Sequence, residues 1–175
     1  MVPKIKKILF TTDLSKESRQ ALDYAISLAT QYGASITILY VMEESQWSTD
    51  DLIKNVLGEE KWQQMRESQE QEARQLLIGK KKEGALIREA LSEFCEEAQK
   101  DHRECEFIMD EIVVTRGVVV DEIIHDAQQR KCDLIVMGYH VRGPFGEALL
   151  GSTTRRVLRR SNVPVLLVRL EKNEP

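Results

Sequence analysis

Hydrophobic and polar positions follow two distinct rhythms along this 175-residue chain. Five short runs rich in Ile, Val and Leu predict buried β-strands, at residues 5–13, 34–42, 107–117, 132–138 and 163–170. Between them, apolar residues recur three and four positions apart, which predicts amphipathic helices. The clearest stripes are Ala21, Leu22, Ala25, Leu28, Ala29 and Tyr32 in one helix and Val120, Ile123, Ile124 and Ala127 in another. This alternation predicts an α/β fold: an open, doubly wound, five-stranded parallel sheet sandwiched by helices.

The first helix carries signals for both of its ends. Gly33 follows the last apolar residue and is expected to end the helix in the left-handed conformation. Ser15 precedes the helix and is expected to cap its start. In open α/β sheets, ligands bind beyond the carboxyl ends of the strands, where the strand order reverses. The strand ends in this chain are Asp13, Val41, residues 115–117 and Gly138.

Residues 43–104 interrupt the alternation because they are too long for one connection. Residues 61–79 and 85–99 both have helical composition, and Gly79 and Gly84 predict a break between them. The second segment has a core-facing stripe, made of Ile87, Ala90, Leu91, Phe94 and Ala98. The first is polar and is expected to face solvent or a partner. We therefore expect a single domain over residues 1–175, in which residues 43–84 form a helical insertion after the second strand.

Composition limits the class of protein. The chain is 42% hydrophobic, has no apolar run near twenty residues, and does not begin with the pattern of a signal peptide, so no membrane contact is expected. Its three cysteines form no CxxC pair, which is typical of a cytoplasmic protein. A net charge of −4 disfavours general nucleic-acid binding. The four arginines of the last predicted helix are interpreted as a solvated face opposite Val157 and Leu158.

Glycines crowd the segment from Gly138 to Gly151, and Ser152 and Thr153 follow where a helix begins. Residues 146–153 have the spacing of a phosphate-binding P-loop, but Ser152 occupies the place of its lysine. The segment also follows the fourth strand, whereas a P-loop usually follows the first. Free amides at the helix start would nevertheless suit an anion. The alternative, equally open on these grounds, is that Gly151 makes a turn and Ser152 caps the helix.

The sequence resembles the universal stress protein family over nearly its whole length. The resemblance is carried by "ILFTTDLSKESRQALDYAISLA", "CDLIVMGYH" and "GSTTRRVLRRSNVPVLLVR". Nucleotide-binding members of that family have a glycine, two residues, a second glycine, nine residues, and then Gly-Ser or Gly-Thr. Gly138 and Gly151-Ser152 match the two ends of this motif, and Val141 replaces its second glycine.

The resemblance implies an adenine-nucleotide α-hydrolase-like fold and a site for ATP or a related adenine nucleotide, with or without Mg²⁺. Asp13 would contact the adenine or ribose, and Thr11 and Val41 would line the adenine pocket. The ribose would lie near Met137 and Gly138, and the phosphates near Gly151, Ser152 and Thr153, with Arg142 as a further phosphate partner. It also implies a homodimer that pairs through the last strand, at Val165, Leu166, Leu167 and Val168.

Two functions follow from these observations. One is a cytoplasmic stress-response protein that binds the nucleotide as a regulatory ligand. The other is a nucleotide-free dimeric scaffold that acts through protein contacts of its insertion, which the β-branched Val141 favours because a glycine there allows positive φ or close backbone approach. The sequence places no nucleophile beside a base, so catalysis beyond slow ATP hydrolysis is not expected. His102 and Cys105 have metal-like spacing but lack a second pair.

Overall fold

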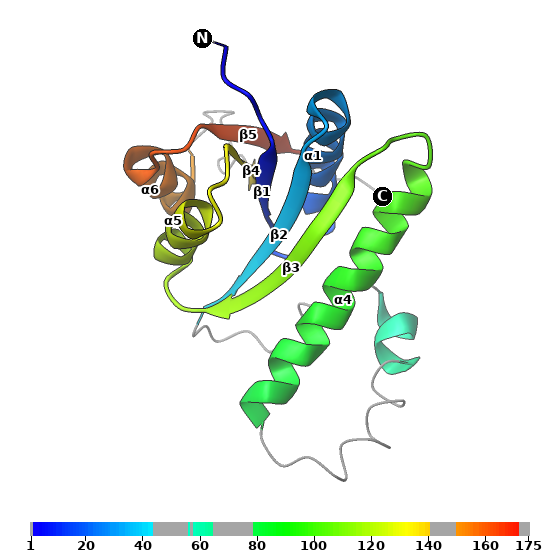
Figure 1. Ribbon diagram of the computed structural model, residues 1–175. Helices are drawn as coiled ribbons and strands as arrows, with labels where there is room; N and C mark the ends of the chain where they lie inside the picture. The colour runs from blue at the N-terminus through cyan, green and yellow to red at the C-terminus, as the bar shows by residue number, and fades with distance from the viewer. Residues whose placement is uncertain (1, 44–55, 57, 65–78, 141–149, 172–175) are drawn as a thin grey trace.

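A five-stranded parallel sheet forms the centre of the molecule (Figure 1). The computed structural model describes residues 2–43, 56, 58–64, 79–140 and 150–171. The strands are β1 (Lys7–Thr11), β2 (Ser35–Met42), β3 (Ile108–Arg116), β4 (Leu134–His140) and β5 (Val165–Leu170). Their order across the sheet is β3-β2-β1-β4-β5. Four strands lie within their predicted apolar runs, and β4 begins in its run and extends two residues beyond it to His140, which confirms the predicted strands and their parallel arrangement.

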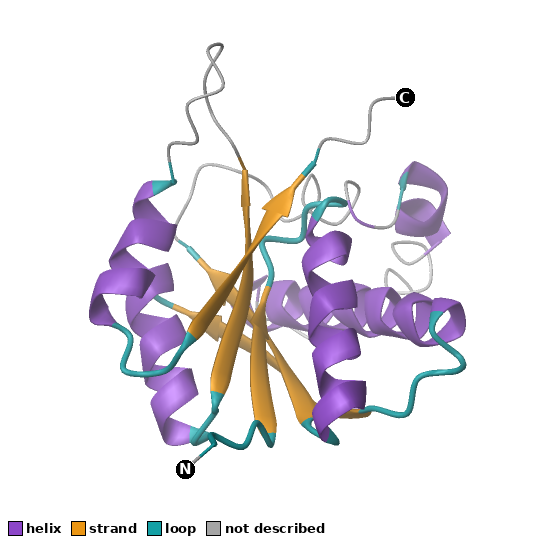
Figure 2. Ribbon diagram, turned by 90° about the horizontal axis from the view of Figure 1, so that it is seen from above, coloured by secondary structure: helices purple, strands orange, loops and turns teal. Residues whose placement is uncertain are grey.

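Helices cover both faces of the sheet, as the doubly wound prediction requires (Figure 2). Helices α1 (Ser18–Tyr32) and α4 (Gly79–Asp101) pack on one face, and α5 (Val119–Gln129) and α6 (Ser152–Arg160) pack on the other. Each strand alternates its side chains between these layers, so Phe10 faces α1 while Leu9 faces α5 and α6. The fold prediction is therefore confirmed.

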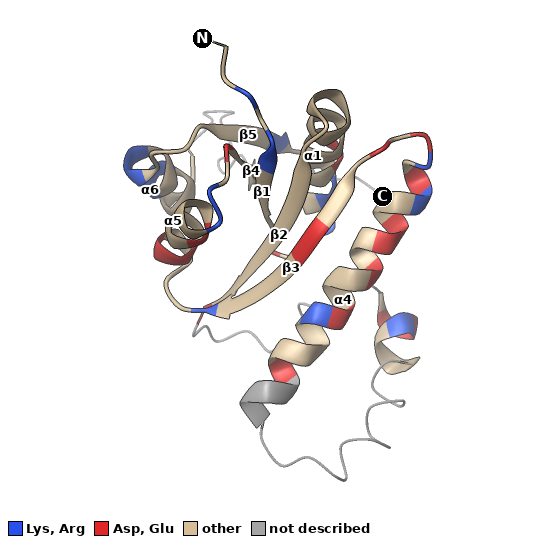
Figure 3. Cartoon of the chain, viewed as in Figure 1, with Lys and Arg blue, Asp and Glu red and all other residues tan. Residues whose placement is uncertain are grey.

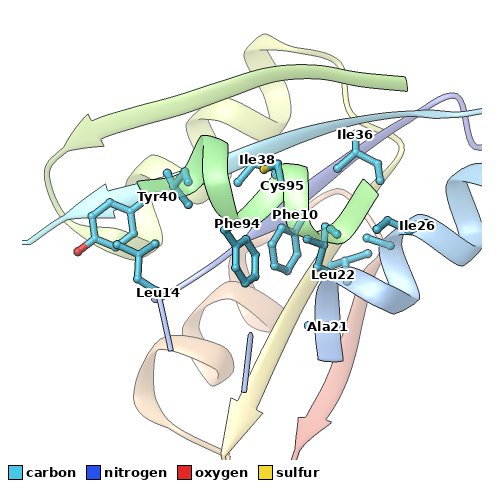
Figure 4. Packing of buried hydrophobic residues seen from close by; sticks show 14 of the residues in the cluster. Phe10, Leu14, Ala21, Leu22, Ile26, Ile36, Ile38, Tyr40, Phe94 and Cys95 are labelled. Carbon is cyan, nitrogen blue, oxygen red and sulfur yellow. The ribbon is translucent and has the colours of Figure 1, made fainter. Parts of the chain in front are cut away.

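The larger core lies between the sheet and the α1–α4 layer. Phe10 and Ile38 project from the sheet into this layer, where they meet Leu22 and Ile26 of α1 and Phe94 of α4 (Figure 4). Phe10, Ile38, Leu22 and Ile26 have no exposed surface, and Phe94 is 6% exposed. Burying a large apolar side chain stabilises a fold by roughly 2–3 kcal/mol, so this layer holds α1 and α4 firmly against the sheet.

The two ends of α1 behave differently from each other. Gly33 has φ 63° and ψ 38° and ends the helix in the left-handed conformation, as predicted. The cap prediction for Ser15 is wrong, because the N-cap residue is Glu17 and no side chain caps the helix. The Ser15 hydroxyl instead donates to Asp13 Oδ1 at 2.6 Å, and the Ser15 carbonyl accepts from Ser18 N at 3.1 Å. The turn before α1 therefore uses its hydroxyl to hold the carboxylate that follows β1.

Helix α4 runs from Gly79 to Asp101 without the break predicted at Gly84. A single glycine costs a helix only about 1 kcal/mol, which the buried stripe below it outweighs. The predicted stripe is confirmed, since Ile87, Ala90, Leu91, Phe94 and Ala98 are all buried. Of the insertion before α4, the structure describes residue 56, a short helical segment at 59–64 and the start of α4 itself.

The last helix corrects one further prediction. Val157 of α6 is fully buried, but Leu158 is 41% exposed and does not share its side. Consecutive residues of a helix point about 100° apart, so a narrow buried stripe accommodates only one of the two. The arginines of α6 are exposed as predicted, and they form the blue patch on this helix in Figure 3. Arg160 pairs with Asp121 of α5 at 2.6 Å.

The strand order reverses between β1 and β4. From β1 the chain winds outward through β2 to β3, and it then crosses back to β4 and β5 on the other side. The carboxyl ends of β1 and β4 therefore mark the switch point at which ligands bind in open α/β sheets. Among the helices in the described part of the chain, none has the length and apolar character needed to cross a membrane.

Candidate functional site: a cavity at the carboxyl edge of the sheet

A cavity of about 800 Å³ lies at this switch point. Its walls come from the ends of β1, β2 and β4, from the turn before α1, and from the start of α6. Pockets that hold small organic ligands typically measure about 300–1,000 Å³, so this one is large enough for a mononucleotide. The cavity lies where the topology alone predicts a ligand site.

The structure brings most of the predicted site residues to this one cavity. The lining includes Thr11, Asp13, Val41, Met137, Gly138, Gly151, Ser152 and Thr153. They come from strand ends and a helix start that are up to 142 positions apart in the sequence, between Thr11 and Thr153. Val141 and Arg142 lie outside the described residues. The other predicted positions therefore lie around one cavity in the structure.

Asp13 is held by the turn that follows β1. Its Oδ1 accepts hydrogen bonds from the Ser15 backbone N–H at 3.0 Å and from the Ser15 hydroxyl at 2.6 Å. Its Oδ2 lies 3.7 Å from His140 Nε2, which is too long for a hydrogen bond. The carboxylate is thus oriented by one oxygen and presents the other to the cavity. An oriented acceptor of this kind suits an amino group or a sugar hydroxyl.

Apolar side chains form the wall beside Asp13. Val41 at the end of β2 and Met137 in β4 are 9% and 5% exposed, and both line the cavity. Val119 and Ile123 of α5 line it as well. A flat aromatic ring can pack against such a surface while its polar edge reaches Asp13. The arrangement combines an apolar wall with a few placed polar groups, which is common in small-molecule sites.

Gly138 has a packing role that the sequence did not reveal. A Cβ atom at this position would lie 2.5 Å from Leu170 Cδ1 and 2.8 Å from Leu170 Cγ. Leu170 is 6% exposed and belongs to the core on the α1 side of the sheet. The absent side chain at Gly138 therefore lets the end of β5 pack closely over β4. This contact shapes the cavity floor, since both residues line it.

The start of α6 provides unpaired backbone donors. Gly151 is the N-cap residue, with φ −56° and ψ 158°, and no side chain caps the helix. The alternative in which Ser152 acts as the cap is therefore wrong, because Ser152 is already the first helical residue. The first turn contains no acidic residue. Its free N–H groups and the positive end of the helix dipole would stabilise an anion near Ser152 and Thr153.

Several lining residues escaped sequence reasoning. Tyr40 lines the cavity from β2, and burial, followed by the charges of Asp13, Glu83 and Glu43, raises the pKa of its hydroxyl to about 12. At neutral pH this hydroxyl is therefore a neutral donor. Arg116 at the end of β3 pairs with Glu83 of α4 at 2.7 Å. The end of β3 was singled out by the strand-end rule, but Glu83 was not, because nothing in the sequence shows where α4 packs.

The cavity is equipped for binding more clearly than for catalysis. Among its described residues, the Ser15 hydroxyl donates to Asp13 rather than to His140, so no hydroxyl is paired with an imidazole. The described part of the chain has no group of three or more His, Cys, Asp or Glu that could hold a metal ion. His102, one of the residues with metal-like spacing, has its Nε2 2.9 Å from Asp23 Oδ1 and so ties the end of α4 to α1.

The sequence of this chain is similar to sequences of known proteins. Residues 4–169 match the model of the universal stress protein family. The chain is 30% identical over 164 residues to universal stress protein MJ0577 of Methanocaldococcus jannaschii, covering 94% of each chain. It is 31% identical over 163 residues to universal stress protein YxiE of Bacillus subtilis, covering 93% of this chain and 98% of that one.

Solved structures agree with this relationship. A structure of MJ0577 aligns with a TM-score of 0.57 and 28% identity, covering 98% of this chain and 100% of that one. Another solved universal stress protein, in complex with cAMP, aligns with a TM-score of 0.55 and 22% identity, covering 95% of this chain and 98% of that one. The second likeness concerns the fold alone.

Proposed function

Because the chain belongs to the universal stress protein family, we propose that its cavity binds ATP or a related adenine nucleotide as a regulatory ligand. The observation that carries this proposal is the meeting of Asp13, an apolar wall and an uncapped helix start in one cavity. These are the three kinds of group that a base, a sugar and a phosphate need. The site of action is the cytoplasm, in keeping with three cysteines that form no disulfide.

Each part of the ligand has a counterpart among the described residues. The base would pack against Val41 and Met137, with Asp13 accepting a hydrogen bond from the base or the ribose. The phosphates would lie at the amides of Ser152 and Thr153, where the helix dipole favours negative charge. Mg²⁺, when it accompanies the nucleotide, would be held mainly by the phosphates, because this ion keeps several waters and needs few protein oxygens.

The ligand is proposed to act as a regulator within a homodimer that pairs along β5. Binding would hold β1, β4 and α6 in one relative position, and β5 is the direct neighbour of β4 in the sheet. Occupancy of the cavity could thereby influence the dimer surface or a partner. One solved protein of the same fold is a complex with cAMP, so adenine nucleotides are a reasonable first class to test.

Calorimetric titration with Mg-ATP tests the proposal, together with mass spectrometry of the protein as purified. We expect saturable binding or co-purified nucleotide, and we expect Asp13→Asn to weaken binding about tenfold because a charged acceptor is lost. Asp23→Asn is the matched control, since Asp23 pairs with Arg19 and His102 and does not line the cavity. A parent protein that neither binds nor retains nucleotide would refute the assignment.

A nucleotide-free dimeric scaffold remains the second candidate, and the residue that favours it is Val141. A β-branched side chain stands at the place of the second motif glycine, in a segment outside the described residues. The variant Val141→Gly separates the two functions. If only the glycine variant binds Mg-ATP, the scaffold is supported and its activity would reside in the insertion. Equal binding by both proteins supports the regulatory site.

A further inference from the structure

His140 is the residue from which the structure allows a further step, which rests on the proposed nucleotide site. We propose that the His140 side chain contacts the phosphate end of the bound nucleotide and makes the affinity depend on the charge of both partners. The cavity would then bind anionic nucleotides more tightly when His140 is protonated. Uncharged adenosine would bind equally well in either state.

The position of His140 places its ring at the cavity without locking it. His140 is the last residue of β4 and pairs in register with Leu170 of β5. Its side chain is 34% exposed, and Nε2 lies 3.7 Å from Asp13 Oδ2. Asp13 already receives two hydrogen bonds from Ser15 on its other oxygen, so its orientation does not depend on the histidine. The imidazole is therefore near a carboxylate that it does not need to stabilise.

The charges of the cavity leave the phosphate end without another described cation. The described lining carries two basic side chains, Arg116 and His140, beside the acidic Asp13, Glu43 and Glu83. Arg116 is engaged by Glu83 at 2.7 Å, at the end of β3. β3 and β4 are separated by β2 and β1, which puts them about 14 Å apart at the spacing of neighbouring strands.

His140 ends β4 and Ser152 begins α6, and both residues line the cavity. Both border the segment between β4 and α6, and Ser152 and Thr153 line the cavity together with His140. The P-loop-like spacing in this segment has a serine where a lysine would neutralise phosphates. A histidine supplies the same charge only below its titration range, which is near pH 6.5 for the unperturbed side chain. The chemistry of this end of the cavity thus becomes pH-dependent.

Other charged residues near His140 also contribute to the electrostatic potential at its ring. The charged residues on the elements around His140 include Asp13, Lys16 and Glu17 before α1, Arg169 and Glu171 at the end of β5, and Arg155, Arg156, Arg159 and Arg160 on α6. Of these, Asp13 is the one in ion-pair distance. A phosphate that enters the cavity brings negative charge close to this ring, and a nearby negative charge favours the protonated form of an imidazole.

The test compares two ligands and three proteins across pH. The affinities of ATP and adenosine are measured by calorimetry from about pH 5.5 to about pH 8, a range that brackets histidine titration. The proteins are the parent, His140→Gln and the control His125→Gln, whose histidine is exposed on α5 away from the cavity. The ratio of parent to variant affinity at each pH cancels the titration of the ATP phosphates themselves. Circular dichroism verifies that each variant is folded.

We expect the parent to bind ATP about tenfold more tightly than His140→Gln at the low end of the range, since a charged hydrogen bond is lost. The difference should disappear as pH rises through the histidine range, and adenosine should show no difference at any pH. His125→Gln should follow the parent. The same gain for adenosine as for ATP would assign His140 a positioning role instead and overturn the proposal.

The outcomes also separate this inference from the nucleotide site on which it rests. ATP binding to the parent and to His140→Gln with the same pH profile would refute the role of His140 and leave the nucleotide site in place. No binding of either ligand to any protein would refute both. A nuclear magnetic resonance titration gives an independent readout: the midpoint of the His140 ring signal should move upward with ATP and stay in place with adenosine.

Discussion

Gly138 and Gly151 mark the two ends of the family motif, yet the structure gives them different physical roles. A Cβ at Gly138 would meet Leu170 at 2.5 Å, whereas a Cβ at Gly151 would meet no atom within 4 Å. Neither residue has a φ in the left-handed region, since Gly151 is at −56° and Gly138 is not among the positive-φ glycines. Gly138 is therefore required for packing, whereas a side chain at Gly151 would lie in open space beside the helix start.

This contrast predicts unequal effects of the same substitution. Gly138→Ala should lower the free energy of unfolding by about 1–3 kcal/mol, because Leu170 must shift within a packed core. Gly151→Ala is the matched control and should cost less than about 1 kcal/mol, since a Cβ there meets no atom and only the poorer N-cap preference of alanine is felt. Denaturant unfolding measures both. Leu170→Ala removes the side chain that the new Cβ at position 138 would meet, so the effects of Gly138→Ala and Leu170→Ala on the free energy of unfolding should not be additive. Strict additivity of these two substitutions would contradict the packing role of Gly138.

The residues of the candidate site divide by how far the sequence could predict them. Asp13, Val41 and Gly138 stand at strand ends, so the strand pattern and the topology rule locate them at one edge of the sheet. Tyr40 and Glu83 could not be found in this way. A tyrosine such as Tyr40 is common in β-strands, so nothing in the sequence distinguishes it as a site residue. Glu83 reaches the cavity only because α4 crosses the sheet near the end of β3.

At the scale of elements, the short helical segment at residues 59–64 belongs to the fold. Trp62 within it is 2% exposed and is part of the core on the α1–α4 side. Lys61 Nζ lies 2.5 Å from Glu97 Oε1 on α4, which ties the segment to that helix. Figure 1 shows the segment beside α4. This part of the expected insertion is thus packed, although its polar composition predicted a segment facing solvent or a partner.

The packing of Trp62 predicts a large loss of stability on truncation. Trp62→Ala should lower the free energy of unfolding by about 3 kcal/mol, because a large buried aromatic side chain is removed. Lys61→Ala should cost less than about 1 kcal/mol, since both members of its ion pair are nearly half exposed and solvent screens them. Denaturant unfolding followed by circular dichroism compares them. Equal, small losses would show that the segment contributes little to the core.

The elements themselves were largely predictable, and the exceptions have local causes. Buried parallel strands need continuous apolar runs, so all five strands could be identified from sequence. The break expected at Gly84 failed because tertiary packing of α4 outweighs the propensity of one glycine. The cap expected at Ser15 failed because its hydroxyl is bound by Asp13. In both cases a local preference competes with another interaction of the same residue or helix, and the sequence does not show which interaction is stronger.

At the scale of the whole molecule, the sheet has two edges of different character. β3 forms one edge and carries the acidic residues Asp110 and Glu111, visible as the red stretch in Figure 3. β5 forms the other edge, where Val165, Leu166 and Leu167 are only half-buried. The Val168 side chain is already in the core, so a contact there would use its backbone. An apolar edge strand invites pairing, whereas charge discourages it.

The proposed homodimer is therefore expected to depend on β5 and to be indifferent to β3. Leu167→Lys should raise the dimer dissociation constant by more than about tenfold, since it places a charge on the pairing edge. Ile108→Lys is the matched control, because Ile108 is 66% exposed at the start of the opposite edge strand. Sedimentation equilibrium of both variants and the parent, with circular dichroism to verify folding, measures the effect. A monomeric parent, or equal dissociation by both variants, would rule out pairing through β5.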